Sequence, residues 1–130
     1  MITAGERTGG GRRILVVDDH VASVTSLSLV LSLLGYDVRC AFDGVEALRC
    51  ATEFKPEIAI LDLSLPLLDG YAVARRMRAM DETRDTLLVA MTGWGSATVS
   101  EQVRASGFDL HLVKPVSVDR LTDALQLAGC

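Results

Sequence analysis

The chain has 130 residues, of which 49% are hydrophobic, so it is long enough for one compact domain with a core of its own. Its net charge is −4, which argues against direct binding of nucleic acid or of an anionic membrane, because both require a clustered basic surface. No apolar run reaches the length of about 18 residues that a membrane-spanning helix needs, so membrane insertion is not expected.

The cysteines and the first residues indicate where the chain works and where its domain begins. Cys40, Cys50 and Cys130 are odd in number and lack metal-ligand spacing, and no secretory signal precedes them, so a cytoplasmic location is expected. Residues 1–12 are mostly small and polar and contain three consecutive glycines. They are expected to form a flexible leader or linker before one domain over residues 13–130.

Short apolar runs alternate with segments in which apolar residues recur at helical spacing. Strands are expected at residues 14–17, 37–41, 58–62, 87–91 and 110–113. Helices are expected at residues 24–34, 45–51, 71–79, 99–105 and 118–128. This alternation predicts an α/β fold, in which a parallel sheet is covered by helices on both faces.

The third predicted helix has one apolar and one basic face. Val73 and Met77 are spaced to face the core. Arg75, Arg76 and Arg78 are expected to lie on the outside of this helix.

Four of the five predicted strands end on polar side chains. These are Asp18 and Asp19, Asp62, Thr92, and Lys114. A single aspartate after a strand is usually only a turn former or helix cap. Because parallel strands place their carboxyl ends at one edge of the sheet, these five residues are expected to converge there.

The charges of this cluster indicate its chemistry. Three carboxylates and one ammonium leave an excess of roughly two negative charges, which a hard divalent cation such as Mg²⁺ would neutralise. One carboxylate could then attack a phosphoryl group while the metal and Lys114 offset the charge on its oxygens. The Thr92 hydroxyl could hydrogen-bond to the new group. The set predicts a phosphoryl acceptor.

Four motifs stand in order along the chain, and together they resemble the response-regulator receiver domain of two-component signalling. Asp62 is separated from Thr92 by 30 residues and from Lys114 by 52, and both separations fit this family. The resemblance implies a single (βα)5 doubly wound sheet with the flavodoxin-like strand order 2-1-3-4-5. The motifs are Val-Val-Asp18-Asp19-His, Leu-Asp62-Leu-Ser-Leu-Pro66-Leu-Leu-Asp-Gly70, Met-Thr92-Gly and Leu-Val-Lys114-Pro115.

The resemblance implies a role for each site residue. Asp62 would accept a phosphoryl group from the phosphohistidine of a histidine kinase or phosphotransfer protein. Asp19, Asp62 and the backbone carbonyl of Ser64 would hold Mg²⁺, and Asp18 would act through a bound water. Lys114 would pair with a phosphoryl oxygen. Apart from its own phosphorylation and slow dephosphorylation, such a domain catalyses no reaction.

The resemblance also implies a conformational switch. Thr92 would move toward the phosphoryl group, His111 would swing inward behind it, and the bond between Lys114 and Pro115 would be cis. Many receivers have Tyr or Phe at the position of His111. A histidine adds a titratable ring and with it a possible pH sensitivity between about 6 and 7, or it sits half-exposed on its strand without a role.

Three further residues lie near the predicted site. Ser64 and Trp94 occupy positions that tune the lifetime of the phosphoryl group in this family. Trp94 would either hinder the hydrolytic water or pack against the surface. His20 is expected to be a solvated residue at the start of a helix rather than a ligand.

The output surface is expected around the fourth helix, the fifth strand and the last helix, in a stand-alone receiver or in part of a hybrid kinase. Three other classes of protein fit the sequence less well. A metal-dependent phosphohydrolase would also use an aspartyl nucleophile, but the Asp-x-Asp-x-Thr pattern is absent at Asp18 and Asp62. A receiver-like binding module without phosphorylation does not fit the intact acidic set. A flavin-binding flavodoxin would need a phosphate loop rich in Ser and Thr.

Overall fold

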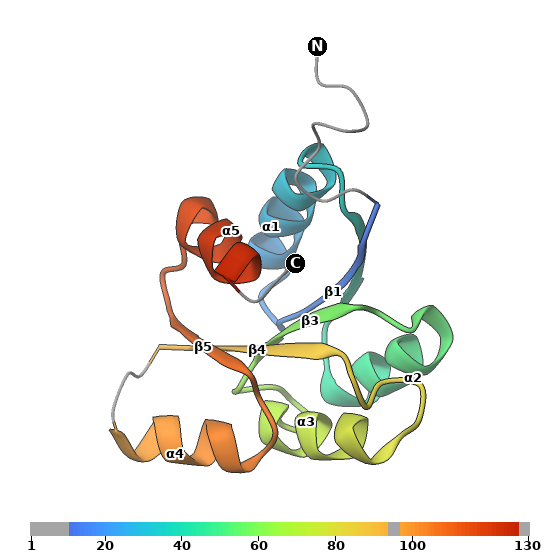
Figure 1. Ribbon diagram of the computed structural model, residues 1–130, viewed down its shortest axis with the longest axis vertical. Coiled ribbons are helices and arrows are strands. Elements are labelled where there is room, and N and C mark those ends of the chain that lie inside the picture. The colour runs from blue at the N-terminus through green and yellow to red at the C-terminus, as the bar shows by residue number, and fades with distance from the viewer. Residues whose placement is uncertain (1–10, 94–96, 128–130) are drawn as a thin grey trace.

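The computed structural model describes residues 11–93 and 97–127, in which five strands alternate with five helices (Figure 1). The strands are β1 (Arg13–Val17), β2 (Asp37–Ala41), β3 (Ile58–Asp62), β4 (Leu87–Thr92) and β5 (Leu110–Val113). The helices are α1 (Val21–Leu33), α2 (Gly44–Phe54), α3 (Gly70–Ala79), α4 (Ala97–Ala105) and α5 (Val118–Leu127). The predicted α/β fold is confirmed.

The five strands form one parallel sheet in the order β2-β1-β3-β4-β5, as the resemblance implied. β3 lies at the centre and all five of its residues are buried, which explains its nearly continuous apolar sequence. Val17 is paired with Leu61, and Asp62 with Met91. This register brings the carboxyl ends of β1, β3 and β4 to the same edge of the sheet.

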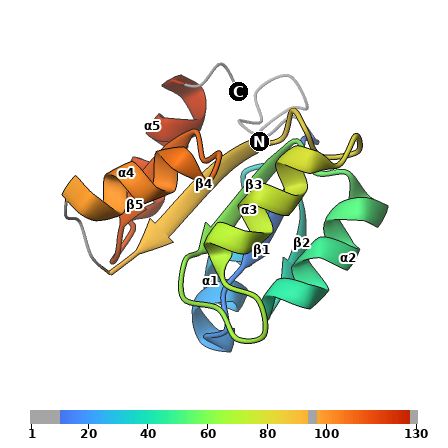
Figure 2. The ribbon, with the colours of Figure 1, turned by 90° about the horizontal axis from the view of Figure 1, so that it is seen from below.

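Helices cover both faces of the sheet. α1 and α5 lie on one face, and α2, α3 and α4 lie on the other (Figures 1 and 2). Successive side chains of a strand point to opposite faces, so Ile60 packs in the core under α1 and α5 while Leu61 packs in the core under α2 and α3. The chain therefore builds two hydrophobic cores, one on each side of the sheet.

α1 contains no charged residue, although much of its surface is exposed. Val24 and Leu31 face the core, whereas Leu29 and Leu33 are exposed. The helix ends before Gly35, which has a φ of 101° that glycine adopts without strain. Among the described helices, none is long and apolar enough to cross a membrane.

Two aspartates fix the starts of α2 and α3 at the carboxyl edge of the sheet. The Asp43 carboxylate accepts a hydrogen bond from the Glu46 backbone N–H at 2.7 Å, and the Asp69 carboxylate accepts one from the Ala72 N–H at 2.9 Å. Caps of this kind stabilise a helix by about 1 kcal/mol each. They hold the first turns of α2 and α3 in place beside the loops that follow the strands.

Arg78 does not lie on the outside of α3, so that prediction was wrong, whereas Arg75 and Arg76 are exposed as predicted. The Arg78 guanidinium is half-buried and donates hydrogen bonds to the carbonyls of Gly107, Arg84 and Thr86 and to the Asp109 carboxylate. Helical spacing alone did not reveal these partners because the chain brings them from two later loops. Arg78 thereby ties α3 to the segments that flank β4 and β5.

Replacing a residue of β3 tests how much this buried strand contributes to the free energy of unfolding. We expect Ile60→Ala to lower the free energy of unfolding by roughly 2–5 kcal/mol, because it leaves a cavity in a fully buried position. Leu33→Ala removes an exposed aliphatic side chain of α1 and should change it by less than about 1 kcal/mol. Urea denaturation of both variants measures the difference, and equal losses would contradict this view of the core.

Candidate functional site

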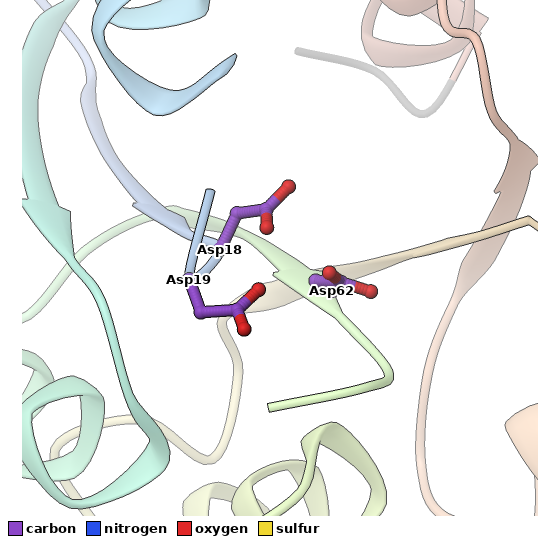
Figure 3. Close-up of side chains that lie close together, drawn as sticks. All are labelled: Asp18, Asp19 and Asp62. Carbon is purple, nitrogen blue, oxygen red and sulfur yellow. The ribbon is translucent and has the colours of Figure 1, made fainter. Parts of the chain in front are cut away.

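Three carboxylates meet at the carboxyl edge of the sheet. Asp18 and Asp19 directly follow β1, and Asp62 is the last residue of β3. Because β1 and β3 are neighbours, one oxygen atom from each carboxylate lies within 4.8 Å of the others (Figure 3). Asp18 and Asp62 are buried, whereas Asp19 is exposed. The cluster therefore opens to solvent on the side of Asp19.

Lys114 supplies the positive charge of this cluster. Its Nζ lies 3.1 Å from Oδ2 of Asp18 and 3.0 Å from Oδ2 of Asp62. These pairs join residues that are 96 and 52 positions apart in the chain. The bond between Lys114 and Pro115 is cis, as the resemblance implied. The site thus brings together the ends of β1, β3 and β5.

Burial and charge act in opposite directions on these groups. Burial raises the pKa of Asp62 above its ordinary value, more than the hydrogen bonds from Lys114 and from the Ser64 N–H lower it. Burial also acts to raise the pKa of Asp18, but the His20 N–H and Lys114 outweigh it, so this pKa is lowered. Burial disfavours the charged form of Lys114, yet its bonds to both aspartates raise its pKa. One ammonium therefore serves two carboxylates, and Asp62 is the less stabilised of the two.

The side-chain donors of this cluster suit a hard cation. Asp18, Asp19 and Asp62 offer only oxygen atoms, and Lys114 balances one of their charges. Mg²⁺ prefers a small number of carboxylate oxygens together with waters, and it leaves places for phosphate oxygens. The residues present therefore fit such an ion.

Thr92 ends β4 beside this cluster. It follows Met91, the partner of Asp62 in the sheet, and it is 5% exposed. The Lys114 N–H donates a hydrogen bond to the Thr92 carbonyl at 2.7 Å, which fixes the end of β4 against the residue after β5. Thr92 therefore lies at the predicted edge. Trp94 lies outside the described residues.

The two histidines occupy different environments. His111 is paired with Ala90 in the sheet and so shares a face with Thr92, on the side covered by α4. It is half-buried, and its Nε2 is buried with no hydrogen-bond partner among the described residues. His20 is the exposed N-cap residue of α1, and its Nδ1 lies 2.6 Å from Oγ of Ser23. His20 thus occupies the predicted helix-start position.

One positioning residue was missed by the sequence analysis. A Cβ atom at Gly70 would lie 2.5 Å from the Asp62 carbonyl oxygen, so the start of α3 approaches the end of β3 more closely than any other residue would allow. The Gly70 N–H also donates to the Leu63 carbonyl at 3.1 Å. The helix predicted over residues 71–79 placed Gly70 just before its start, but this close approach depends on the packing of α3 against the sheet.

A cavity of about 510 Å³ adjoins the acidic cluster. It lies between α1 and the segment after β5, and it reaches Asp18 and Lys114 at one end. Most of its other lining residues are apolar, among them Val24, Leu27, Val30, Pro115 and Val116. The site therefore has polar groups at its centre and an apolar recess beside it.

Fold and site together define the class of flavodoxin-like α/β domains that carry an acidic cluster at the carboxyl edge of a parallel sheet. The sequence model of the response regulator receiver domain matches residues 14–126. The chain belongs to this family. Receiver domains of this family take a phosphoryl group from histidine kinases or phosphotransfer proteins and bind Mg²⁺ at an acidic pocket.

Two curated relatives differ in length. The DNA-binding dual master transcriptional regulator RpaA of Synechocystis is 36% identical over 109 residues, which are 84% of this chain and 45% of that protein. The sporulation initiation phosphotransferase F of Bacillus subtilis is 30% identical over 114 residues, which are 88% of this chain and 90% of that protein. The chain thus spans about half the length of the first relative and nearly all of the second.

Two solved structures share the fold. The chemotaxis protein CheY4 of Vibrio cholerae has a TM-score of 0.85 and 28% identity, with 89% of this chain and 97% of that chain covered. The receiver domain of the sensor histidine kinase PA1611 of Pseudomonas aeruginosa has a TM-score of 0.82 and 32% identity, with 90% of this chain and 96% of that chain covered. That second structure has a magnesium ion coordinated in its active-site cleft.

The raised pKa of Asp62 predicts a pH-dependent gain in stability when its charge is removed. Folding favours the protonated form of Asp62, so its contribution to stability is present below the ordinary value of 3.8 and is lost as the pH rises through the folded-state pKa. In the absence of divalent cations, Asp62→Asn should therefore raise the urea midpoint at pH 7 more than at pH 4. Asp85→Asn, at an exposed loop position, should shift neither midpoint appreciably. A larger gain at pH 4 would contradict the assignment.

Proposed function

We propose that this receiver domain is a phosphoacceptor switch in which Asp62 takes a phosphoryl group from the phosphohistidine of a partner protein, with Mg²⁺ present. The observation that supports this most directly is the position of the Asp62 carboxylate, 3.0 Å from the Lys114 ammonium and next to Asp18 and Asp19. We further propose that Asp19, Asp62 and the Ser64 carbonyl hold the ion, and that Asp18 acts through a water. The ion supplies positive charge that offsets the oxygens of the transferring group.

The transfer is a displacement at phosphorus. An oxygen of the ionised Asp62 carboxylate forms the new bond to phosphorus while the bond from phosphorus to the histidine nitrogen breaks, and the electron pair of that bond stays on the imidazole. The Lys114 ammonium, already 3.0 Å from Asp62, pairs with an oxygen of the phosphoryl group. Asp62 shares this one ammonium with Asp18. The oxygens of the phosphoryl group therefore join a set of charged side chains that already interact.

The bound phosphoryl group changes the surface around α4, β5 and α5. Thr92 moves toward the new group, and His111 moves into the space behind it. These residues share one face of the sheet, under α4. The Nε2 of His111 is buried without a hydrogen-bond partner among the described residues, so a movement that pairs it is favourable. The group thereby biases two arrangements of the same surface.

The proposed function also bears on the bounds of the domain, its location and the reactions it catalyses. We propose that the receiver domain covers residues 13–130, since β1 begins at Arg13. A cytoplasmic location is supported by the free thiols of Cys40 and Cys50. The domain catalyses its own phosphorylation and slow dephosphorylation and no other reaction.

Incubation with acetyl phosphate and Mg²⁺ should add one phosphoryl group to the wild-type chain. The Asp62→Asn variant should accept no phosphoryl group, because the nucleophilic carboxylate is gone. EDTA should abolish the phosphorylation of the wild type. Intact-mass spectrometry measures each product. The modification should survive acid and be lost in alkali, as expected of an acyl phosphate.

Asp69→Asn is the matched control, since Asp69 lies in the same loop but caps α3 rather than facing the acidic cluster. It should accept a phosphoryl group like the wild type. Phosphorylation of Asp62→Asn at the wild-type level would refute Asp62 as the acceptor.

Replacing His111 separates a role of the imidazole from one of bulk. Addition of beryllofluoride, a phosphoryl mimic, with Mg²⁺ should change hydrogen exchange in α4 and β5. We expect the pH profile of this change to differ between the wild type and His111→Phe, because the variant lacks the imidazole. Identical pH profiles for the two proteins would count against a role for the imidazole.

A further inference from the structure

Leu67 lies at the tip of the loop between β3 and α3, at a position where a leucine side chain does not stabilise the fold. Its φ is 68°, in the left-handed region, and the Leu68 N–H donates to the Pro66 carbonyl across it at 2.7 Å. This is a γ-turn with positive φ at its central residue, the rarer and more strained kind. The Leu67 side chain is also 79% exposed. Neither burial nor a relaxed backbone accounts for the residue.

Hydrogen bonds at both ends fix the loop that carries Leu67 to Asp62 and to the residue after it. At its start, the Ser64 N–H donates to the Asp62 carboxylate at 3.1 Å. At its end, the Gly70 N–H donates to the Leu63 carbonyl at 3.1 Å. Leu67 is therefore held on the rim of the site that contains Asp62.

The start of α2 adds a second exposed aliphatic residue to this rim. The Gly44 N–H lies 3.4 Å from the Pro66 carbonyl, and a Cβ at Gly44 would overlap the Leu68 carbonyl oxygen at 1.9 Å. Val45, the next residue, is 55% exposed. We call Val45, Pro66, Leu67 and Leu68 the Leu67 patch.

The charged groups around the Leu67 patch are acidic. Asp43, Glu46 and Asp69 lie at the starts of α2 and α3, and no Lys or Arg occurs in residues 14–38, 40–48 and 56–74. Basic side chains gather instead around the cavities at the amino ends of the strands; they are Arg12, Arg13, Lys55, Arg78 and Arg84. A surface that complements the patch therefore has an apolar centre bordered by basic residues.

We propose, on the basis of the function proposed above, that the Leu67 patch is a docking surface for the protein that delivers the phosphoryl group. Asp62 is only 6% exposed, so a protein that brings a phosphohistidine to it must cover the rim of the site. The partner presents an apolar surface bordered by Lys or Arg next to its phosphohistidine. A small phosphodonor reaches Asp62 without covering the rim.

The test compares two kinds of donor on Leu67→Asn. Asn tolerates positive φ, so the variant should keep or raise the thermal midpoint. Its initial rate of phosphorylation should fall roughly tenfold with a protein donor, the effect of losing a well-packed contact, and should stay within about twofold of wild type with acetyl phosphate. The protein donors are purified, phosphorylated histidine kinase and phosphotransfer domains from the source genome, of which the fastest for the wild type is used. Val45→Ser should show the same selective loss.

Lys55→Asn is the matched control. Lys55 is also exposed with a positive φ of 51°, but it ends α2 at the opposite edge of the sheet, so both rates should match the wild type. Equal rates for Leu67→Asn and wild type with both donors would overturn the docking proposal, as would an equal loss with both, which would mean that Leu67 acts on the geometry of the site.

Two other results would also overturn it. The first is transfer to the wild type from acetyl phosphate but from none of the protein donors. The second is a concentration-dependent self-association of the wild type that Leu67→Asn abolishes, which would assign the patch to a second copy of the chain. Failure of acetyl phosphate to modify even the wild type would instead refute the proposed function.

Discussion

The sharing of one ammonium by two buried carboxylates is the interaction on which this site depends. Lys114 lies within 3.1 Å of Asp18 and Asp62, and the third carboxylate, Asp19, stands beside them without a direct pair to it. Burying like charges together is costly unless each is compensated. The cluster is therefore left with uncompensated negative charge, which suits the binding of a hard cation.

The parallel sheet makes this arrangement possible without strain in the core. β3 is buried along its whole length, so its polar residue can only stand at its end, where the chain leaves the apolar layer. Asp18 likewise follows the buried run of β1, and Lys114 follows β5. The register of the strands then sets the distances between these side chains. The site is assembled from strand ends that the hydrophobic core aligns.

Two residues that break local rules lie close to the carboxyl edge of the sheet. Leu67 has a positive φ and is exposed, and the Nε2 of His111 is buried without a partner among the described residues. At the other edge, the polar groups around Arg78 are paired. Sequences that fold well satisfy local preferences, so exceptions near a site indicate function rather than folding. The exceptions at Leu67 and His111 thus fit the site proposed at this edge, whereas the positive φ of Lys55 at the other edge is that of a helix C-cap.

The sequence by itself determined the order and type of the elements and the identity of the cluster, because buried strands need apolar runs and their ends are where polar residues follow. It did not determine which oxygens face Lys114, the close approach at Gly70, the partners of Arg78 or the positive φ of Leu67. These depend on how distant loops pack against one another, and a pattern of single residues carries no record of that packing. Hydrophobic periodicity thus specified the layers of the fold, whereas tertiary contacts decided the pairing of the charged groups, the positive φ of Leu67 and the exposure of its side chain.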